Sequence, residues 1–295
     1  MNNAPFLSFD NKQLRLFVIV LFGSFLIWDL YTCYVAHSEC SIMGDLAVII
    51  LPIPGYDQVL SDPLGIKVLM TGESGAGPNR FWAHFITAVY FNNIPFLLQD
   101  LGAQPIDSIY IACGIIKLLT QLGLMLHLSK WVLGNRSLFS MAGVLLMAFS
   151  CAFFLTTDTR YRAFDLKSTM TIIDHSIAYA VFYSTSLLLL MLYLHPFLQR
   201  IRGFKAPTFT LAQHIGLFLL SFVVSFNGAF NSPVLLIFCP LLLLAEWVKN
   251  YKTLDPSTSF FQKTIKAIQK IPRGILFHFI WIGILNLYSF YLGTY

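Results

Sequence analysis

Two acidic residues in the amino-terminal third of the chain are candidates for acid–base chemistry. Asp45 and Asp57 flank an apolar run at 46–53, so a membrane face would hold them in a partly dry setting. Such a setting raises the pKa of a carboxyl group towards working pH, which suits a general base. The alternative interpretation is that both carboxylates are solvated surface charges.

Three arginines have the chemistry to bind an anionic headgroup. Arg80 follows a glycine-rich stretch at 72–79, and Arg160 and Arg162 stand in the string Asp-Thr-Arg-Tyr-Arg-Ala-Phe-Asp at 158–165. A guanidinium group presents a planar fork of donors that matches a phosphate or pyrophosphate. The alternative is that these side chains extend from helix ends to the membrane interface without binding a ligand.

The glycine-rich stretch does not predict a nucleotide site. Its glycines begin like a phosphate-binding loop, but that motif then needs Lys followed by Ser or Thr. Pro78 and Asn79 occupy those two positions. The Cys and His residues also lack the spacing of a metal site. We therefore expect neither a metal nor a cofactor.

Ionisable residues inside apolar segments are costly in hydrocarbon and therefore informative. Asp29, Lys117, His214 and His278 lie in such segments. Lys117 could pair with Asp29 across the helices or line a polar cavity. The two histidines could bond to backbone or to Ser and Thr neighbours, and no chain of groups indicates a proton path.

A polar hairpin at 225–233 joins two apolar segments. It reads Ser-Phe-Asn-Gly-Ala-Phe-Asn-Ser-Pro, and Asn227, Gly228 and Asn231 suit a tight turn before Pro233. The functional interpretation is a polar rim for a sugar-like headgroup. The turn alone also explains these residues.

The composition shows which elements must position these groups. The chain has 295 residues, of which 57% are hydrophobic and only 11% charged, and its mean hydropathy is +0.70. An average soluble domain is about 25% charged. We therefore expect an all-α polytopic integral membrane helix bundle, treated as one membrane domain over 1–295, in a plasma or bacterial inner membrane.

A bilayer core about 30 Å thick needs about 20 apolar residues per helix. Seven windows meet this requirement: 14–34, 108–127, 137–157, 173–194, 209–229, 232–248 and 274–293. An eighth window, 81–98, is interrupted by Asn92, Asn93 and Pro95, so it could span, re-enter or lie in the interface. The sequence thus predicts seven or eight transmembrane helices.

Basic residues orient these helices because cytoplasmic loops are enriched in Lys and Arg. The segments 197–207 and 249–273 are basic and are expected in the cytoplasm. The segment 35–80 is then a long first external loop whose apolar stretches pack on the membrane. Within 249–273, apolar residues at helical spacing alternate with lysines over 256–271. This pattern predicts an amphipathic helix on anionic headgroups, or else a basic linker that only sets topology.

The order of these segments resembles the GT-C superfamily of polytopic glycosyltransferases. The resemblance rests on a first span, a long acidic external loop, and the aromatic and proline-containing stretches at 79–85, 93–99 and 105–110. It implies that an acid of the first external loop acts in catalysis and that outer basic groups hold a polyprenyl phosphate. Those roles would fall on Asp45 or Asp57 and on Arg80, Arg160 or Arg162.

The expected function is therefore glycosyl transfer from a lipid-phosphate-linked sugar at the outer face. A transporter or flippase is one alternative, favoured by the ionisable residues in spans, and a non-enzymatic subunit of a membrane complex is the other. The expected partners are membrane lipids, including a polyprenyl phosphate, or other subunits. No nucleic acid partner is expected.

Overall fold

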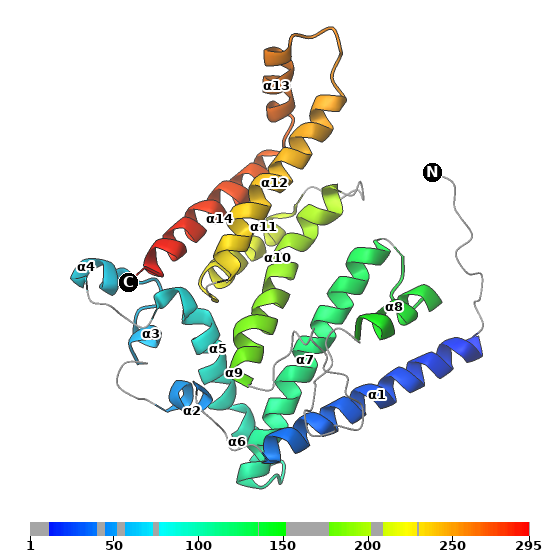
Figure 1. Ribbon diagram of the computed structural model, residues 1–295, viewed down its shortest axis with the longest axis vertical. Coiled ribbons are helices and arrows are strands. Elements are labelled where there is room, and N and C mark those ends of the chain that lie inside the picture. The colour runs from blue at the N-terminus through cyan, green and yellow to red at the C-terminus, as the bar shows by residue number, and fades with distance from the viewer. Residues whose placement is uncertain are drawn as a thin grey trace. The chain divides into compact units, whose positions relative to one another are not determined.

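The computed structural model describes residues 12–39, 45–51, 57–72, 77–134, 136–151, 177–201, 209–228 and 230–294. Within these ranges every regular element is a helix, as the sequence predicts (Figure 1). The contacts divide the chain into two compact units. Unit 1 comprises residues 1–52 and 86–188, and unit 2 comprises residues 53–85 and 189–295.

Unit 1 holds the first helix and the helices on either side of residue 135. Its elements are α1 (Lys12–Glu39), α2 (Asp45–Ile50), α6 (Ile94–Asp100), α7 (Pro105–Leu133), α8 (Met141–Cys151), α9 (Ile177–Tyr179) and the π-helical segment η2 (Ala180–Thr185). Helix α1 packs against α7 and α8, and α6 packs against α7. Lys117 is buried on α7. The Asp29 side chain lies outside the described structure, so the pairing of these two residues stays a prediction.

Unit 2 holds most of the loop helices and the carboxy-terminal half of the chain. Its elements are α3 (Asp57–Ser61), α4 (Ile66–Thr71), η1 (Pro78–Arg80), α11 (Leu211–Ser225), α12 (Asn231–Lys252), α13 (Phe260–Gln269) and α14 (Arg273–Leu292). Helix α5 (Phe81–Phe91) divides between the units after Phe85, and α10 (Ser186–Ile201) divides after Leu188. Helix α14 packs against both α11 and α12.

Four helical segments are long and apolar enough to cross a membrane: Pro105–Leu133, Ala180–Arg200, Asn231–Lys252 and Arg273–Leu292. They match four of the seven expected windows, and this supports a membrane protein. The windows 137–157 and 209–229 contain the shorter apolar helices Met141–Ser150 and Leu211–Ser225. The window 14–34 falls on α1, which has 28 residues but is not among those four. The count of seven or eight spans therefore stays a prediction.

The window 81–98 is not one helix. Helix α5 has 11 residues and α6 has seven, and the turn at Asn92 and Asn93 separates them. Pro95 stands in the first turn of α6, where its missing N–H does no harm. Eleven residues extend for only about 16 Å, roughly half of the hydrocarbon core. Neither helix alone can cross the membrane.

The two ends of α14 define two ends of unit 2. Helices α12 and α14 run antiparallel, because Ser232 Oγ lies 3.3 Å from Ser289 Oγ while α13 connects their opposite ends. We call the end where α14 finishes the loop end, since α4 and η1 pack there. We call the end where α14 begins the basic end, since Lys249, Lys252 and Arg273 lie there.

The segment 256–271, expected to form an amphipathic helix, contains α13, which ends shortly before Pro272. A turn precedes it, in which the Ser257 N–H donates to Asp255 Oδ1 over 2.9 Å. This hydrogen bond, with a second from the Ser257 side chain, lowers the pKa of the Asp255 carboxyl below its ordinary value. The charged form of Asp255 thus helps to order the turn between α12 and α13.

Candidate functional site

Backbone contacts bring the long loop onto the hairpin between α11 and α12. The Trp82 N–H donates to the Phe226 carbonyl over 3.0 Å. The Tyr288 hydroxyl of α14 donates to the Leu64 carbonyl over 2.6 Å. Segments of the chain more than a hundred residues apart therefore meet at the loop end of unit 2.

Close packing at two glycines completes this junction. A Cβ on Gly65 would lie 2.6 Å from a methyl group of Leu292, and one on Gly293 would lie 2.9 Å from the Asn79 amide nitrogen. Gly65 also has a φ of 68°, which glycine adopts without strain. The absence of side chains at both positions lets α4 and η1 approach the end of α14.

Small polar residues join the ends of α11, α12 and α14 at this junction. The Ser289 hydroxyl of α14 donates to the Ser225 carbonyl over 2.6 Å, and the Asn231 amide donates to the Val224 carbonyl over 3.0 Å. Ser232 lies within bonding distance of both Ser225 and Ser289. Short polar side chains allow apolar helices to approach closely and to bond inside a membrane.

Several buried polar atoms at this junction have no partner among the described residues. They are both amide atoms of Asn227, the Ser225 hydroxyl and the Asn286 carbonyl oxygen. A buried polar group left unpaired costs about 1–3 kcal/mol, so each such group needs an explanation. The Asn227 amide is fully buried beside the residue that accepts from Trp82.

Arg80 is the cationic group nearest in sequence to this junction. It ends η1 and is exposed, while its neighbour Asn79 is buried against Gly293. Trp82 bonds to Phe226, which directly precedes Asn227 in the chain. Arg80 lies two residues before Trp82. A guanidinium group that can donate to phosphate and an amide that can bond to hydroxyl groups thus lie at one end of one unit. We call Asn79, Arg80, Asn227, Asn231 and Ser289 the loop-end cluster.

The two candidate acids of the segment 35–80 belong to different units. Asp57 begins α3 in unit 2, whereas Asp45 begins α2 in unit 1. The side chains of both lie outside the described structure, so their catalytic role stays a prediction. Asp62 is buried and accepts the Val68 N–H over 3.1 Å. This bond satisfies a backbone donor in the first turn of α4, which is a structural role.

Arg160 and Arg162 fall within 152–176, outside the described residues. The proposed headgroup pocket of 158–165 is therefore untested. Of the three arginines expected to bind phosphate, the structure places only Arg80. Among the described residues, no group of three or more His, Cys, Asp or Glu could hold a metal ion.

A second polar arrangement lies between α11 and α14. His214 Nδ1 is 2.9 Å from His278 Nε2, and the two rings are nearly parallel. Sequence reasoning expected bonds to backbone or hydroxyl groups, but the two histidines bond to each other. Edge-on contacts from Phe209 and Phe197 surround the pair. His278 Nδ1 has no partner within the described structure.

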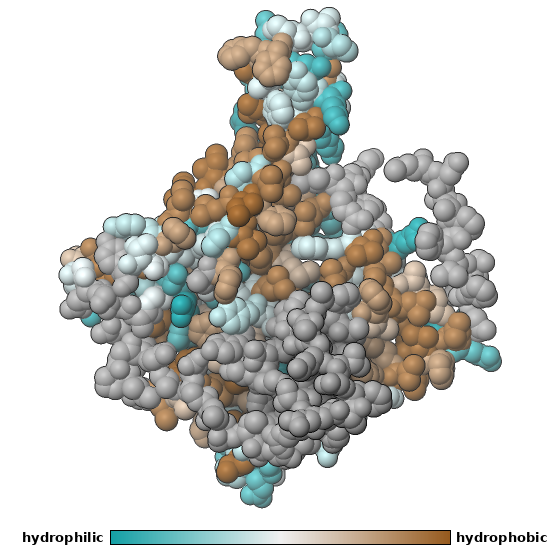
Figure 2. Space-filling view, viewed as in Figure 1, coloured by the Kyte–Doolittle hydropathy of each residue, from teal (hydrophilic) through white to brown (hydrophobic). Residues whose placement is uncertain are grey.

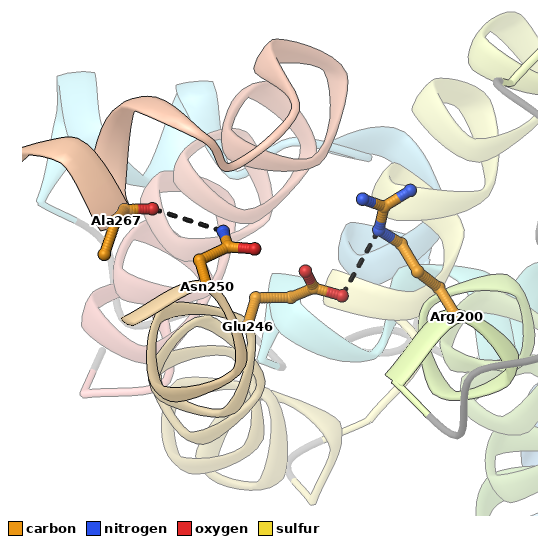
Figure 3. A network of polar contacts seen from close by, with 4 residues as sticks. All are labelled: Arg200, Glu246, Asn250 and Ala267. Atoms are coloured by element: carbon orange, nitrogen blue, oxygen red, sulfur yellow. Dashed lines mark hydrogen bonds and ion pairs between the residues drawn. The ribbon is translucent and has the colours of Figure 1, made fainter. Parts of the chain in front are cut away.

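A third polar arrangement lies at the basic end (Figure 3). Arg200 Nε is 3.2 Å from Glu246 Oε1, and one turn further along α12 the Asn250 amide donates to the Ala267 carbonyl over 3.2 Å. These bonds join α10 to α12 and α12 to α13. They are structural contacts, because each charged or amide group faces a protein partner.

Sequence reasoning missed Asn79, Asn286 and Ser289. Asn286 and Ser289 stand in an apolar span, and a search for charged residues passes over neutral amides and hydroxyls. Asn79 was considered only as a departure from a nucleotide motif. The spacing of Asn286 and Ser289, three apart on α14, is the signal that places both on one helix face.

No protein family, no curated protein and no solved structure matches this chain.

Proposed function

We propose that this protein is a membrane glycosyltransferase that uses a lipid-phosphate-linked sugar at the outer face. The observation that carries the proposal is the loop-end cluster, in which exposed Arg80 and the buried Asn227 amide, which has no partner among the described residues, lie on contacting segments. A guanidinium group suits the phosphate, and an amide suits the hydroxyl groups of a sugar.

In the proposed reaction, the carboxylate of Asp57 removes a proton from an acceptor hydroxyl. The acceptor oxygen forms a bond to the anomeric carbon as the bond from that carbon to the phosphate oxygen breaks. The lipid phosphate leaves with the electron pair, and Arg80 stabilises its charge. Asp57 is preferred to Asp45 because it belongs to the same unit as Arg80.

The first test is native mass spectrometry of the purified protein with a polyprenyl phosphate as the probe. We expect Arg80→Gln to lower the retained probe about tenfold, because a charge-assisted hydrogen bond contributes roughly 1.5–3 kcal/mol. Arg136→Gln is the control, since Arg136 is also an exposed arginine but belongs to unit 1. Equal retention by wild type and Arg80→Gln would contradict the phosphate role.

The catalytic role of Asp57 has its own test. Asp57→Asn should retain the polyprenyl phosphate probe but lose transfer from a sugar-loaded lipid phosphate. Full transfer by Asp57→Asn would exclude this residue as the base. If wild type binds only ordinary phospholipid and copurifies with a fixed ratio of another subunit, the non-enzymatic alternative replaces the proposal.

A proton-coupled transporter is the second candidate. It is favoured by the bonded histidines, His214 and His278, which join α11 to the spanning helix α14. Histidines in membrane segments serve as proton carriers in transporters. Substrate flux in liposomes that depends on a pH gradient and fails in His278→Gln would favour this function over transfer.

A further inference from the structure

Helix α13 presents an apolar strip that the rest of unit 2 does not cover. Phe261, Ile265 and Ile268 recur at helical spacing and are 73%, 41% and 47% exposed. Residues at i, i+4 and i+7 lie along one face of a helix. Such a strip in water is unfavourable, so it calls for an apolar occupant.

Fixed contacts determine which faces of α13 remain free. Ala267 is fully buried, and its carbonyl accepts the Asn250 amide of α12 (Figure 3). Lys263 Nζ lies 4.5 Å from the centre of the Tyr251 ring, and the Phe260 ring also contacts Tyr251. These contacts hold α13 beside the last turns of α12, so the apolar strip is a fixed surface feature.

The surroundings of the strip are strongly basic. Lys263, Lys266 and Lys270 lie on α13 and just after it, and the adjoining ends of α12 and α14 add three more cations, Lys249, Lys252 and Arg273. Glu246 is paired with Arg200, and the charge of Asp255 in the turn before α13 offsets only one of these six cations. The occupant must therefore offer negative charge as well as apolar surface.

The depth of α13 follows from the length of α12. Helix α12 has 22 residues, and this number corresponds to about 33 Å, against a hydrocarbon core of about 30 Å. If Asn231 lies at one edge of the core, Asn250 and Tyr251 lie at the other edge. Because α13 contacts those two residues, it lies at the level of the lipid headgroups.

Apolar surface also continues from α13 towards the spanning helices. Leu241 and Leu244 of α12 and Phe277 and Ile280 of α14 are exposed. Figure 2 shows apolar atoms on one side of the projecting α12–α13 hairpin and along the helices below it, with hydrophilic atoms on its other side. A bilayer is the occupant that would cover a surface continuous with two spans.

We propose that α13 is a headgroup-level anchor that binds anionic lipids. Phe261, Ile265 and Ile268 insert at the boundary of the acyl chains, and Lys263, Lys266 and Lys270 contact lipid phosphates. An amphipathic helix with a basic face binds anionic membranes through burial of its apolar side chains and through attraction between its cations and the lipid charges. The anchor holds the basic end at a fixed depth, and this role is independent of the glycosyl transfer proposed above.

The test uses the full chain, with its native cysteines replaced, in phosphatidylcholine liposomes containing phosphatidylglycerol. A spin label is placed at Phe261→Cys or, as the matched control, at Gln262→Cys on another face of α13. We expect the label at 261 to collide mainly with oxygen, which concentrates in lipid. The label at 262 should collide mainly with a water-soluble nickel chelate.

A lysine substitution tests the charge contribution. Lys266→Gln should lower the ratio of lipid-inserted to water-exposed label at position 261 about fivefold, because each cation near an anionic surface contributes about 1 kcal/mol. Lys67→Gln at the loop end is the control and should leave the ratio unchanged. Liposomes of phosphatidylcholine alone should weaken insertion in the same direction.

Two outcomes would overturn the proposal. Equal access of the nickel chelate to both labels would show that the strip is in water. Protection of the label at 261 from both reagents would show that protein, either a second copy or another subunit, covers the strip. The first result would leave the loop-end cluster and its ligand test unaffected.

Discussion

Glu246 and Arg200 illustrate how single residues are constrained at the basic end of unit 2. Their side chains are 3% and 29% exposed, so the carboxylate is desolvated while the guanidinium still reaches water. A buried carboxylate is stable only where a cation or several donors compensate for its lost hydration. Arg200 therefore stabilises Glu246 more than Glu246 stabilises Arg200.

This asymmetry predicts unequal effects of the two single substitutions. Breaking a buried ion pair costs about 3–5 kcal/mol, and we expect about 2–3 kcal/mol for Arg200→Gln because the pair is partly solvated. Glu246→Gln should cost less, since Arg200 can be hydrated. The free energy of unfolding in detergent, measured for both variants and the double variant, checks this expectation. Equal losses in the two single variants would contradict it.

The buried amides at the loop end show a different constraint. Asn227 could have been a simple turn residue, and its place after α11 agrees with that. A turn does not explain why Asn227 is completely buried with both of its amide atoms unpaired among the described residues. For this reason the buried Asn227 amide supports the proposed ligand.

At the scale of elements, the loop end depends on glycines that allow helices to meet. Gly65 precedes α4 and Gly72 follows it, and both have a φ of 68°. Only Gly65 faces another element, because a Cβ there would meet Leu292 and Pro78, whereas one at Gly72 would meet nothing within 4 Å. Substitutions at the two glycines therefore share the backbone strain and differ in side-chain packing.

We therefore expect Gly65→Ala to be more destabilising than Gly72→Ala. Both variants incur the strain of a left-handed alanine, about 1–2 kcal/mol. Gly65→Ala also displaces the buried Leu292 side chain, and overpacking of this kind typically adds about 1–3 kcal/mol. Thermal unfolding of the two variants in the same detergent measures the difference. Equal melting temperatures would mean that α4 does not pack on α14 in solution.

At the scale of the whole molecule, the open question is how many helices cross the bilayer and in which direction. Unit 2 supplies a direct test, because α12 and α14 each span the distance between its loop end and its basic end. If these helices cross the membrane, the two ends must face opposite sides. The basic residues predict that the basic end lies in the cytoplasm.

Cysteine labelling in intact cells tests this arrangement. Met70 on α4 is 82% exposed, and Ser257 in the turn before α13 is also exposed. In a cysteine-replaced chain, a membrane-impermeant maleimide should label Met70→Cys directly and Ser257→Cys only after the cells are permeabilised. The reverse pattern would show that the orientation is inverted. Labelling of both from outside would show that α12 and α14 do not span.

The sequence by itself determined the helical class, the location of four helices long and apolar enough to span a membrane, and the helix α13. Each of these depends on hydrophobicity along a local stretch of chain, since lipid solvation and helical hydrogen bonds act locally. It also marked Arg80 as a candidate for anion binding, because an arginine beside a glycine-rich stretch can be recognised in the sequence, whereas the exposure of Arg80 came from the structure. The sequence also showed that Asn92 and Asn93 interrupt the window 81–98, where the structure has a turn between α5 and α6.

Only the tertiary structure decided which distant groups meet. It joined His214 to His278, Arg200 to Glu246, and the segment of Trp82 to that of Phe226. These contacts depend on how helices are paired and rotated, and such pairing is a property of packing that hydropathy does not encode. The burial of Asn227 has the same origin, because a turn residue becomes buried only when another segment covers it.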